Sequence, residues 1–336
     1  MKLSTVAIFG IGNPLIDVVI NVEDHDLKDL GVKKGIMHLV DENRQKELMN
    51  YFNNRLPIFH PGGSAPNTLL ACAGLGIQGV ISGKIGNDAF GEIYQAQVEK
   101  YGINSRLVIS DGPTGSSIIL VTPDGERTMN THLGMCQDFS IADIDESLLA
   151  KADIFYFTGY MWDTESQKSA ITHALSIAKD NRIKVIFDVA DPFAVHRYRD
   201  AFLTLIEEEV DVVFANQAEL SILFDTENIE KATKSLGRIA NMAAVKLGKK
   251  GCYVIEKGDL YKISSRPIIA KDSTGAGDMF AAGFMAALSK GYRGKTAGEI
   301  GGYLAEEIIQ IPGAQFEKSV IKQINKELPW PIESPN

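Results

Sequence analysis

The residues best suited to chemistry lie in a glycine-rich turn that leads into an apolar, alanine-rich helix, within the segment 271–284. Gly275 and Gly277 carry no side chain, so the backbone N–H groups of this turn can point at one bound anion. The positive end of the helix dipole adds to the attraction. Such a turn stabilises charge on a transferred phosphoryl group, and the Asp278 carboxylate within it can accept the proton of an attacking hydroxyl. The alternative is that Asp278 and Ser273 are ordinary helix caps.

A second polar group precedes another alanine-rich helix, in the segment 62–71. The pair Gly62 and Gly63 is followed there by Pro66, which a helix tolerates in its first turn. Asn67 comes next and, taken alone, is most simply a helix cap.

Together these segments resemble the ribokinase and adenosine kinase family, also called the PfkB carbohydrate kinases, over nearly the whole chain. The C-terminal signature of that family contains Asp-Thr-x-Gly-Ala-Gly-Asp, and residues 272–278 read Asp-Ser-Thr-Gly-Ala-Gly-Asp. The N-terminal signature, a glycine pair followed by Asn and an alanine-rich helix, is matched by residues 62–71. The first strand of the family ends in Gly-Asn with an Asp shortly after, as do Gly12, Asn13 and Asp17.

The resemblance implies an ATP-dependent kinase that phosphorylates a hydroxyl group on a small molecule. The residues that it implies for the acceptor side are Asp278 as the catalytic base, Gly275, Ala276 and Gly277 as the anion hole, and Asp17, Gly63 and Asn67 for the sugar hydroxyls. A carboxylate and an amide suit that last task, because each forms directed hydrogen bonds to neighbouring hydroxyls. Without the resemblance, Asp17 is simply a solvated strand residue.

The resemblance also implies a magnesium and phosphate motif at Asn216-x-x-Glu219. Because Mg²⁺ keeps several waters and takes few protein carboxylates, Glu219 is expected to bind it through water. The alternative is a capping box at the start of a helix. The resemblance leaves open whether a potassium ion sits behind Asp272, as it does in some relatives.

A nucleotide-side turn is expected at Gly248 and Gly251, with Thr274 and Lys246 as further ATP-binding residues. The family often has Thr at the position of Lys246, so the chain departs from the commonest pattern there. The alternative for the segment 248–251 is a simple hairpin turn.

Short apolar runs that alternate with amphipathic segments must position these groups. The runs are 6–9, 80–82, 154–157, 185–187, 212–214, 243–246 and 252–255. Continuous apolar strands between helices predict an α/β fold with a mainly parallel sheet covered on both faces. Ligands bind such sheets beyond the carboxyl ends of the strands, where several of these motifs lie.

Two regions interrupt this alternation, because each contains two β-like runs that lie close together without a helix between them. The runs are 15–22 with 36–40, and 115–121 with 127–131, the last two joined through Asp124-Gly125 as in a hairpin. We expect them to form a small β-sheet lid, as in the ribokinase-like fold that the resemblance implies. The expected core is about 1–13, 61–104 and 135–336, and the lid about 14–60 and 105–134. The alternative is an edge extension of the main sheet.

Composition limits the remaining function classes. The formal net charge of −9, without a long Lys/Arg run, argues against sequence-independent nucleic-acid binding. The three cysteines fit neither a zinc site nor a redox pair and are typical of a reducing compartment. Since no run of about 18 apolar residues occurs, we expect no membrane span and a cytoplasmic protein. Whether it is a monomer or a homodimer stays open, because family lids either pair or stand alone.

Two other classes share this sheet architecture. An oxidoreductase would need a dinucleotide fingerprint, but after Gly10 and Gly12 the third glycine is replaced by Leu15. A noncatalytic nucleotide-binding protein is disfavoured because Asp278 and its glycine turn are retained.

The acceptor is predicted from the lid. Segments 34–41, 125–134 and 159–163 resemble bacterial adenosine kinase-like members of the family. Met37 and Leu133 offer the apolar or polarizable surface on which a purine base can pack. These features favour transfer from ATP to the 5′-hydroxyl of adenosine, with Mg²⁺. The alternatives are a simple sugar such as ribose or fructose, and a lid in which both residues merely pack against the core.

Overall fold

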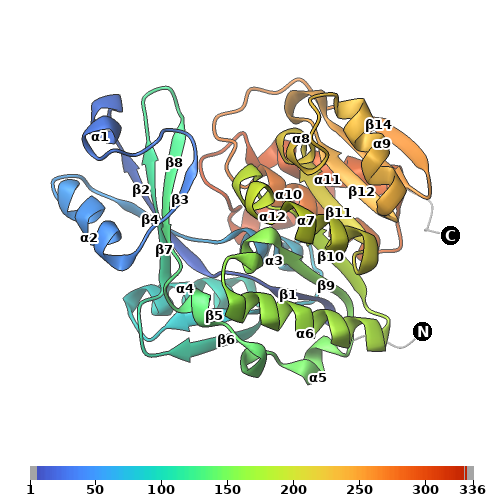
Figure 1. Cartoon of the computed structure of the whole chain (residues 1–336), viewed down its shortest axis with the longest axis horizontal. Helices are drawn as coiled ribbons and strands as arrows, with labels where there is room; N and C mark the ends of the chain where they lie inside the picture. The colour runs from blue at the N-terminus through green and yellow to red at the C-terminus, as the bar shows by residue number, and fades with distance from the viewer. Residues whose placement is uncertain (1–5, 329, 331–336) are drawn as a thin grey trace.

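Two β-sheets organise the chain in the computed structural model, which describes residues 6–328 and residue 330 (Figure 1). The larger sheet has nine strands in the order β14-β13-β12-β11-β10-β9-β1-β5-β6. Its strands are β1 (Val6–Ile11), β5 (Gly79–Gly86), β6 (Asn104–Ser110), β9 (Ala152–Thr158), β10 (Lys184–Asp188), β11 (Val212–Asn216), β12 (Met242–Lys246), β13 (Cys252–Glu256) and β14 (Asp259–Ile263). Pairing is parallel from β6 to β12 and antiparallel from β12 to β14. The predicted α/β fold is confirmed.

Helices cover both faces of this sheet. One layer contains α3 (Ser64–Gly74), α4 (Ala89–Tyr101), α10 (Ala276–Ser289), α11 (Gly294–Ile308) and α12 (Lys318–Glu327), and the other contains α5 (Glu146–Leu149), α6 (Glu165–Asn181), α7 (Pro192–Glu208), α8 (Gln217–Leu223) and α9 (Ile229–Ile239). Short 3₁₀ turns lie at Gly134–Asp138, Ile141–Asp143, Gly159–Trp162 and Gly248–Lys250. Strand side chains such as Phe155 and Phe187 are fully buried, because a parallel sheet covered on both sides has no solvated face.

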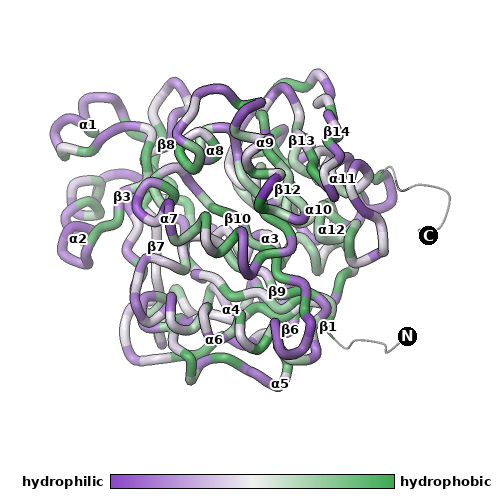
Figure 2. Tube along the Cα trace, turned by 45° about the vertical axis from the view of Figure 1, so that its right-hand side comes forward, coloured by the Kyte–Doolittle hydropathy of each residue, from purple (hydrophilic) through white to green (hydrophobic). Residues whose placement is uncertain are grey.

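The smaller sheet stands beside this core and has the order β3-β8-β7-β2-β4 (Figure 1). Its strands are β2 (Leu15–Asn21), β3 (Met37–Leu39), β4 (Ile58–Gly62), β7 (Gly115–Val121) and β8 (Arg127–His132), and α1 (Asp24–Asp29) and α2 (Glu42–Tyr51) pack on it. Those two helices are largely hydrophilic in Figure 2. The expectation that no helix lies between the first two lid strands is wrong, since α1 lies there; it is short and mostly charged, so it lacks an apolar periodicity. The predicted hairpin is present, since β7 and β8 pair antiparallel and Gly125 turns with a φ of +82°.

Successive side chains of β2 point to opposite faces of the small sheet. Ile16 and Val18 are buried with Leu48 of α2, whereas Asp17 points to the opposite face of the sheet. That opposite face looks toward the carboxyl ends of the core strands. We call the small sheet with α1 and α2 the lid.

The expected boundary of the lid at residue 105 is wrong. Strand β6 pairs with β5 in the large sheet, with Val80 opposite Asn104. The strand is an edge strand and begins with Asn104, Ser105 and Arg106, which are exposed. Because only one side of an edge strand is paired and it is partly solvated, it lacks the continuous apolar run that marks the other core strands.

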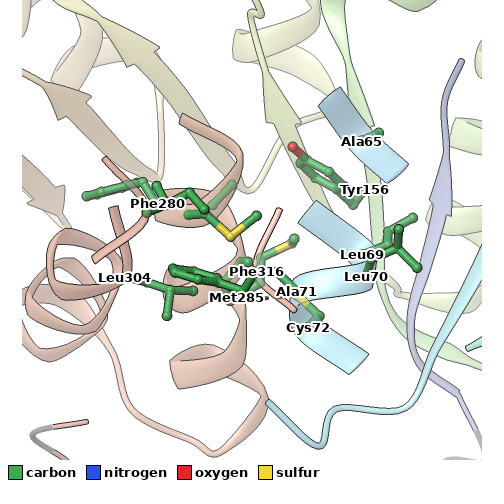
Figure 3. Packing of buried hydrophobic residues seen from close by; sticks show 14 of the residues in the cluster. Ala65, Leu69, Leu70, Ala71, Cys72, Tyr156, Phe280, Met285, Leu304 and Phe316 are labelled. Atoms are coloured by element: carbon green, nitrogen blue, oxygen red, sulfur yellow. Dashed lines mark hydrogen bonds between the residues drawn. The ribbon is translucent and has the colours of Figure 1, made fainter. Parts of the chain in front are cut away.

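Helices α3 and α10 pack against each other along their length. Figure 3 shows Ala71 and Cys72 of α3 near Met285 of α10. Close approach is possible because both helices are rich in small residues, and the Cys72 thiol donates a 3.7 Å hydrogen bond to the carbonyl oxygen of Ala282. This packing brings the first turns of the two helices together.

The turn that begins α3 depends on glycine at position 63. Gly63 has a φ of +94°, and a Cβ there would lie 2.0 Å from the carbonyl oxygen of Asn13. We predict that Gly63→Ala lowers the free energy of unfolding by more than the roughly 1–3 kcal/mol that a strained φ alone costs. The matched control is Gly76→Ala, because Gly76 has a φ of +84° but no atom within 4 Å of its Cβ position. Urea unfolding of both variants checks this, and equal losses would contradict it.

Candidate active site

One cavity of about 970 Å³ lies between the lid and the carboxyl ends of the core strands. It is lined by all of the site residues predicted from the sequence, namely Asp17, Met37, Gly63, Asn67, Leu133, Asn216, Glu219, Lys246, Gly248, Gly251, Thr274, Gly275, Ala276, Gly277 and Asp278. The fold therefore brings together segments that are far apart in the sequence.

The glycine turn is the start of α10. Gly275 is the N-cap with a φ of +73°, and a Cβ on it would lie 2.6 Å from the carbonyl oxygen of Ala314. The N–H groups in the first turn of a helix have no partner within the helix. The Ala276 N–H donates back to Ser273, so those of Gly277 and Asp278 are the ones left to face an anion.

The Asp278 carboxylate lies at the meeting point of α3 and α10. Its Oδ1 accepts a 2.6 Å hydrogen bond from the Ser64 hydroxyl, and its Oδ2 accepts one of 3.0 Å from Nδ2 of Asn67. Burial raises the pKa of Asp278 to about 7, although the hydrogen bonds from Ser64 and Asn67 oppose the rise. A carboxylate with a pKa near neutrality is suited to general-base catalysis.

Asp17 is a second carboxylate in the cavity and is half-buried. It packs against Gly62, where an added Cβ would lie 2.5 Å from its Oδ2. Burial raises the pKa of Asp17 to about 7, with the Arg127 guanidinium opposing the rise and Asp278 adding to it. The two carboxylates therefore influence each other's ionisation.

The lid contributes an apolar wall to the cavity and one ion pair across it. The wall residues are Leu15, Met37, Leu39, Ile119, Met129 and Leu133. Arg127 on β8 donates a 3.0 Å hydrogen bond to Oδ2 of Asp272. This contact ties the lid to the loop that carries the glycine turn.

Asp272 in turn organises that loop. Its Oδ1 accepts from the backbone N–H and the hydroxyl of Thr274, and its Oδ2 also accepts from the N–H of Gly313 at 2.9 Å. Burial acts to raise the pKa of Asp272, but these hydrogen bonds outweigh it and the net shift is downward. The Thr274 hydroxyl is therefore engaged within the turn while the residue lines the cavity.

Asn216 and Glu219 form a capping box at the start of α8. The Asn216 side chain accepts from the N–H of Glu219 at 3.0 Å, and Oε2 of Glu219 accepts from the N–H of Asn216 at 2.6 Å. Burial raises the pKa of Glu219, and the Lys246 ammonium opposes the rise. The capping box and the expected metal role thus fall on one buried carboxylate.

Lys246 supplies a buried cation beside the anion turn. Its Nζ lies 2.9 Å from Oδ2 of Asp188 at the end of β10, and a Cβ on Gly277 would lie 3.3 Å from the same nitrogen. Burial lowers the pKa of Lys246, but Asp188 and Glu219 raise it by more, so the net shift is upward. The residue that departs from the family pattern is therefore a charged ammonium at the turn.

Gly248 and Gly251 connect β12 to β13. Both have positive φ angles, +56° and +90°, and the strands that they join pair antiparallel. The hairpin alternative is therefore correct for the backbone, and the same two residues line the cavity.

Four residues of this site were not singled out for a role from the sequence, namely Ser64, Arg127, Asp188 and Gln315. Ser64 and Arg127 lie inside the segments 62–71 and 125–134, which carry the resemblance to the family, so the sequence already pointed to these regions. Asp188 follows an apolar run, which is the place where ligand-binding groups of an open sheet occur. Gln315 lies in a loop between α11 and α12 without a motif.

Neither a cluster of metal-binding side chains nor a membrane-spanning helix occurs among the described residues. Between residues 6 and 328, and at residue 330, no three His, Cys, Asp or Glu side chains gather as a metal-binding group. A divalent cation with several waters would instead fit next to the two buried carboxylates Asp188 and Glu219, whose charges Lys246 partly balances. In the part of the chain that the structure describes, none of the helices has the length and hydropathy needed to cross a membrane.

The chain is similar to known kinases over nearly its whole length. The solved adenosine kinase from Sinorhizobium meliloti is 32% identical, with a TM-score of 0.90, and the match covers 96% of this chain and 99% of that one. A probable sugar kinase from Rhizobium etli is 31% identical with a TM-score of 0.91, over 97% and 99% of the two chains. Adenosine kinase from Dictyostelium discoideum is 29% identical, over 94% of this chain and 98% of its own length.

The family model described as pfkB family carbohydrate kinase matches residues 46–320, which include both signatures and most of the lid. The chain therefore belongs to the pfkB family of carbohydrate kinases, phosphotransferases that act on an alcohol group.

Proposed function

We propose that this kinase transfers the γ-phosphoryl group of ATP to the 5′-hydroxyl of adenosine. The observation that carries the proposal is that the cavity has both polar groups and a large apolar surface. Asp17 of β2 and Asn67 of α3 line it together with apolar residues that include Met37 and Leu133. A ribose would use the polar groups alone, whereas a nucleoside also covers the apolar surface with its base.

The acceptor would be held by its ribose. The Asp17 carboxylate and the Asn67 amide bind the ribose hydroxyls, and the primary hydroxyl then faces Asp278. The names of the relatives from Sinorhizobium meliloti and Dictyostelium discoideum support a nucleoside in this position.

The chemistry follows from the groups around Asp278. As the hydroxyl oxygen attacks the γ-phosphorus, its proton passes to Asp278 and the bond to the bridging oxygen of ADP breaks. The N–H groups of Gly277 and Asp278 and the Lys246 ammonium stabilise the charge on the transferred group. The lid excludes water that would otherwise compete with the acceptor.

ATP and Mg²⁺ would occupy the side of the cavity that faces β11 to β13. Gly248, Gly251 and Thr274 line that side, and Glu219 would hold the metal through water. When bound, Mg²⁺ neutralises charge on the β- and γ-phosphates. The three buried cysteines carry free thiols, which suits the reducing cytoplasm as the site of the reaction.

A simple sugar is the second candidate for the acceptor. The similarity to a probable sugar kinase from Rhizobium etli is as extensive as the similarity to an adenosine kinase. Asp17 and Asn67 would hold ribose or fructose in the same way, and the apolar wall would then only close the site. A coupled assay of ADP release with adenosine, other nucleosides, ribose and fructose decides between the two.

The acceptor prediction concerns the wall of the lid. Met37→Asp is expected to lower kcat/KM for adenosine at least tenfold, because a charge replaces the apolar contact with the base, and to change kcat/KM for ribose much less. The matched control is Leu56→Asp, since Leu56 is also in the lid segment but is 95% exposed and does not line the cavity. If the kcat/KM of the wild type for ribose or fructose equals or exceeds its kcat/KM for adenosine, the nucleoside proposal is wrong.

The base prediction concerns Asp278. Asp278→Asn is expected to lower kcat by about 10²–10⁴-fold while ATP binding and the fold persist. Because only the ionised carboxylate accepts a proton, and burial raises the pKa of Asp278 to about 7, wild-type kcat/KM should rise with pH through about 7. Stopped assays from pH 5 to 9 measure this.

Asp17 provides the control for the pH profile, because burial also raises its pKa to about 7. Asp17→Asn should raise the KM for the acceptor and keep an acid limb in the pH profile of kcat/KM. An acid limb that disappears in Asp17→Asn would transfer the assignment from Asp278 to Asp17.

The metal prediction concerns Glu219. Activity should vanish in excess chelator and return with Mg²⁺, and Glu219→Gln should raise the Mg²⁺ concentration needed for half-maximal rate. The amide of that variant also weakens the capping box with Asn216, so thermal melting must be measured in parallel. Full activity of the wild type in excess chelator would contradict the metal role.

A further inference from the structure

The loop between α11 and α12 touches both halves of the catalytic apparatus. Its Gly313 N–H donates to Asp272, and its Ala314 backbone packs where a side chain on Gly275 would have to lie. The next residue, Gln315, reaches the other helix of the site and contacts Asn67. One short segment thus lies against the glycine turn and against the partner of the base.

The hydrogen bonds of Gln315 fix which way its amide faces. Its Nε2 lies 3.0 Å from the carbonyl oxygen of Pro61 and 2.6 Å from Oδ1 of Asn67. A backbone carbonyl can only accept, so the nitrogen of Gln315 must face Pro61. The oxygen of Gln315 accepts from Nε2 of Gln97 at 2.7 Å, which agrees with that orientation.

The orientation of Gln315 in turn fixes that of Asn67. Since the Gln315 nitrogen donates toward Asn67, the Asn67 oxygen must face it, and the Asn67 nitrogen is left to face Asp278. The reversed Asn67 amide would set its oxygen against an oxygen of the Asp278 carboxylate and its nitrogen against the nitrogen of Gln315. Both contacts would be repulsive.

We propose that Gln315 is a positioning residue, which holds the Asn67 amide so that it always donates to Oδ2 of Asp278 and keeps this carboxylate ionised and correctly oriented as the base. The inference rests on the proposed function, because it concerns the same base. It adds a residue outside the recognised motifs whose effect on Asp278 passes through Asn67.

The same arrangement favours the ionised base. Oδ2 faces a nitrogen that can only donate, so the lone pair that faces Asn67 stays unprotonated. Oδ1 faces the Ser64 hydroxyl, which can rotate and accept as well as donate. Of the two partners, only the Asn67 amide therefore acts as an obligatory donor.

Other charged or titratable groups also act on Asp278. They are Asp17 from β2, Asp188 from β10 and Lys246 from β12, with the buried phenols of Tyr156 and Tyr160 from β9 and the turn after it. All of them are unchanged in the variants below.

The test compares Gln315→Met, which keeps length but cannot donate, with Gln315→Glu, which keeps shape but replaces the donor with an acceptor. Loss of the enforced Asn67 donation makes Asp278 hold its proton more tightly, so the acid limb of kcat/KM should move to higher pH in both Gln315 variants. Below the wild-type midpoint, kcat/KM should fall about tenfold in Gln315→Met, the scale of one lost hydrogen bond to a charge. It should fall further in Gln315→Glu, which also adds a negative charge near Asp278. If Gln315 only filled space, Gln315→Met would leave the acid limb in place.

Gln97→Met is the matched control, because it removes the outermost hydrogen bond but leaves the Pro61 carbonyl to orient Gln315. Its acid limb should stay at the wild-type position. A melting curve for each variant separates a loss of folded protein from a loss of activity.

A second readout does not need turnover. The carboxyl ¹³C signal of Asp278, assigned by its absence in Asp278→Asn, gives the titration midpoint of the base directly, and this midpoint should rise in both Gln315 variants. An unchanged midpoint in Gln315→Met, or a smaller shift in Gln315→Glu than in Gln315→Met, overturns the positioning role. If the wild type phosphorylates no acceptor, the proposed function fails, and the carboxyl titration still decides the role of Gln315.

Discussion

The site depends on the burial of one carboxylate between two helix N-termini. Asp278 is placed in the first turn of α10 and receives hydrogen bonds from the first turn of α3. Burial makes the charged form less favourable, and the donors and helix ends make it more favourable. The balance sets the pKa of Asp278 near neutrality, and it holds only while α3 and α10 stay packed through their small residues.

The rest of the fold also affects the pKa of Asp278, because it determines which charged groups lie near this carboxylate. The carboxyl ends of β10, β11 and β12 bring Asp188, Asn216 and Lys246 together, while the lid brings Asp17 and Arg127 from the other side. The Lys246 ammonium is balanced by Asp188, and incoming phosphates would compete for it.

Much of the fold could be predicted because each core strand buried on both faces is a continuous apolar run, and because Asp124-Gly125 marks its hairpin. Strand β6 could not, since an edge strand that begins with Asn104 and Arg106 has the composition of a loop. The cavity gathers every residue that the motifs indicated, yet Gln315 has no local pattern. Its contact with Asn67 arises from how α12 closes on α3, and such tertiary contacts leave no periodic trace in the sequence.

The alternation along β2 has a consequence for how the family can vary. Asp17 faces the cavity and its neighbours Ile16 and Val18 face α2, so one inserted residue within β2 would exchange the two sets. A carboxylate would then enter the apolar interior of the lid, and an aliphatic side chain would replace the acid in the cavity. The turn at Gly125 has no such coupling, because no atom lies within 4 Å of a Cβ placed there. Lids of different length can therefore arise at the tip of the β7–β8 hairpin, whereas the strand that carries the acid must keep its length.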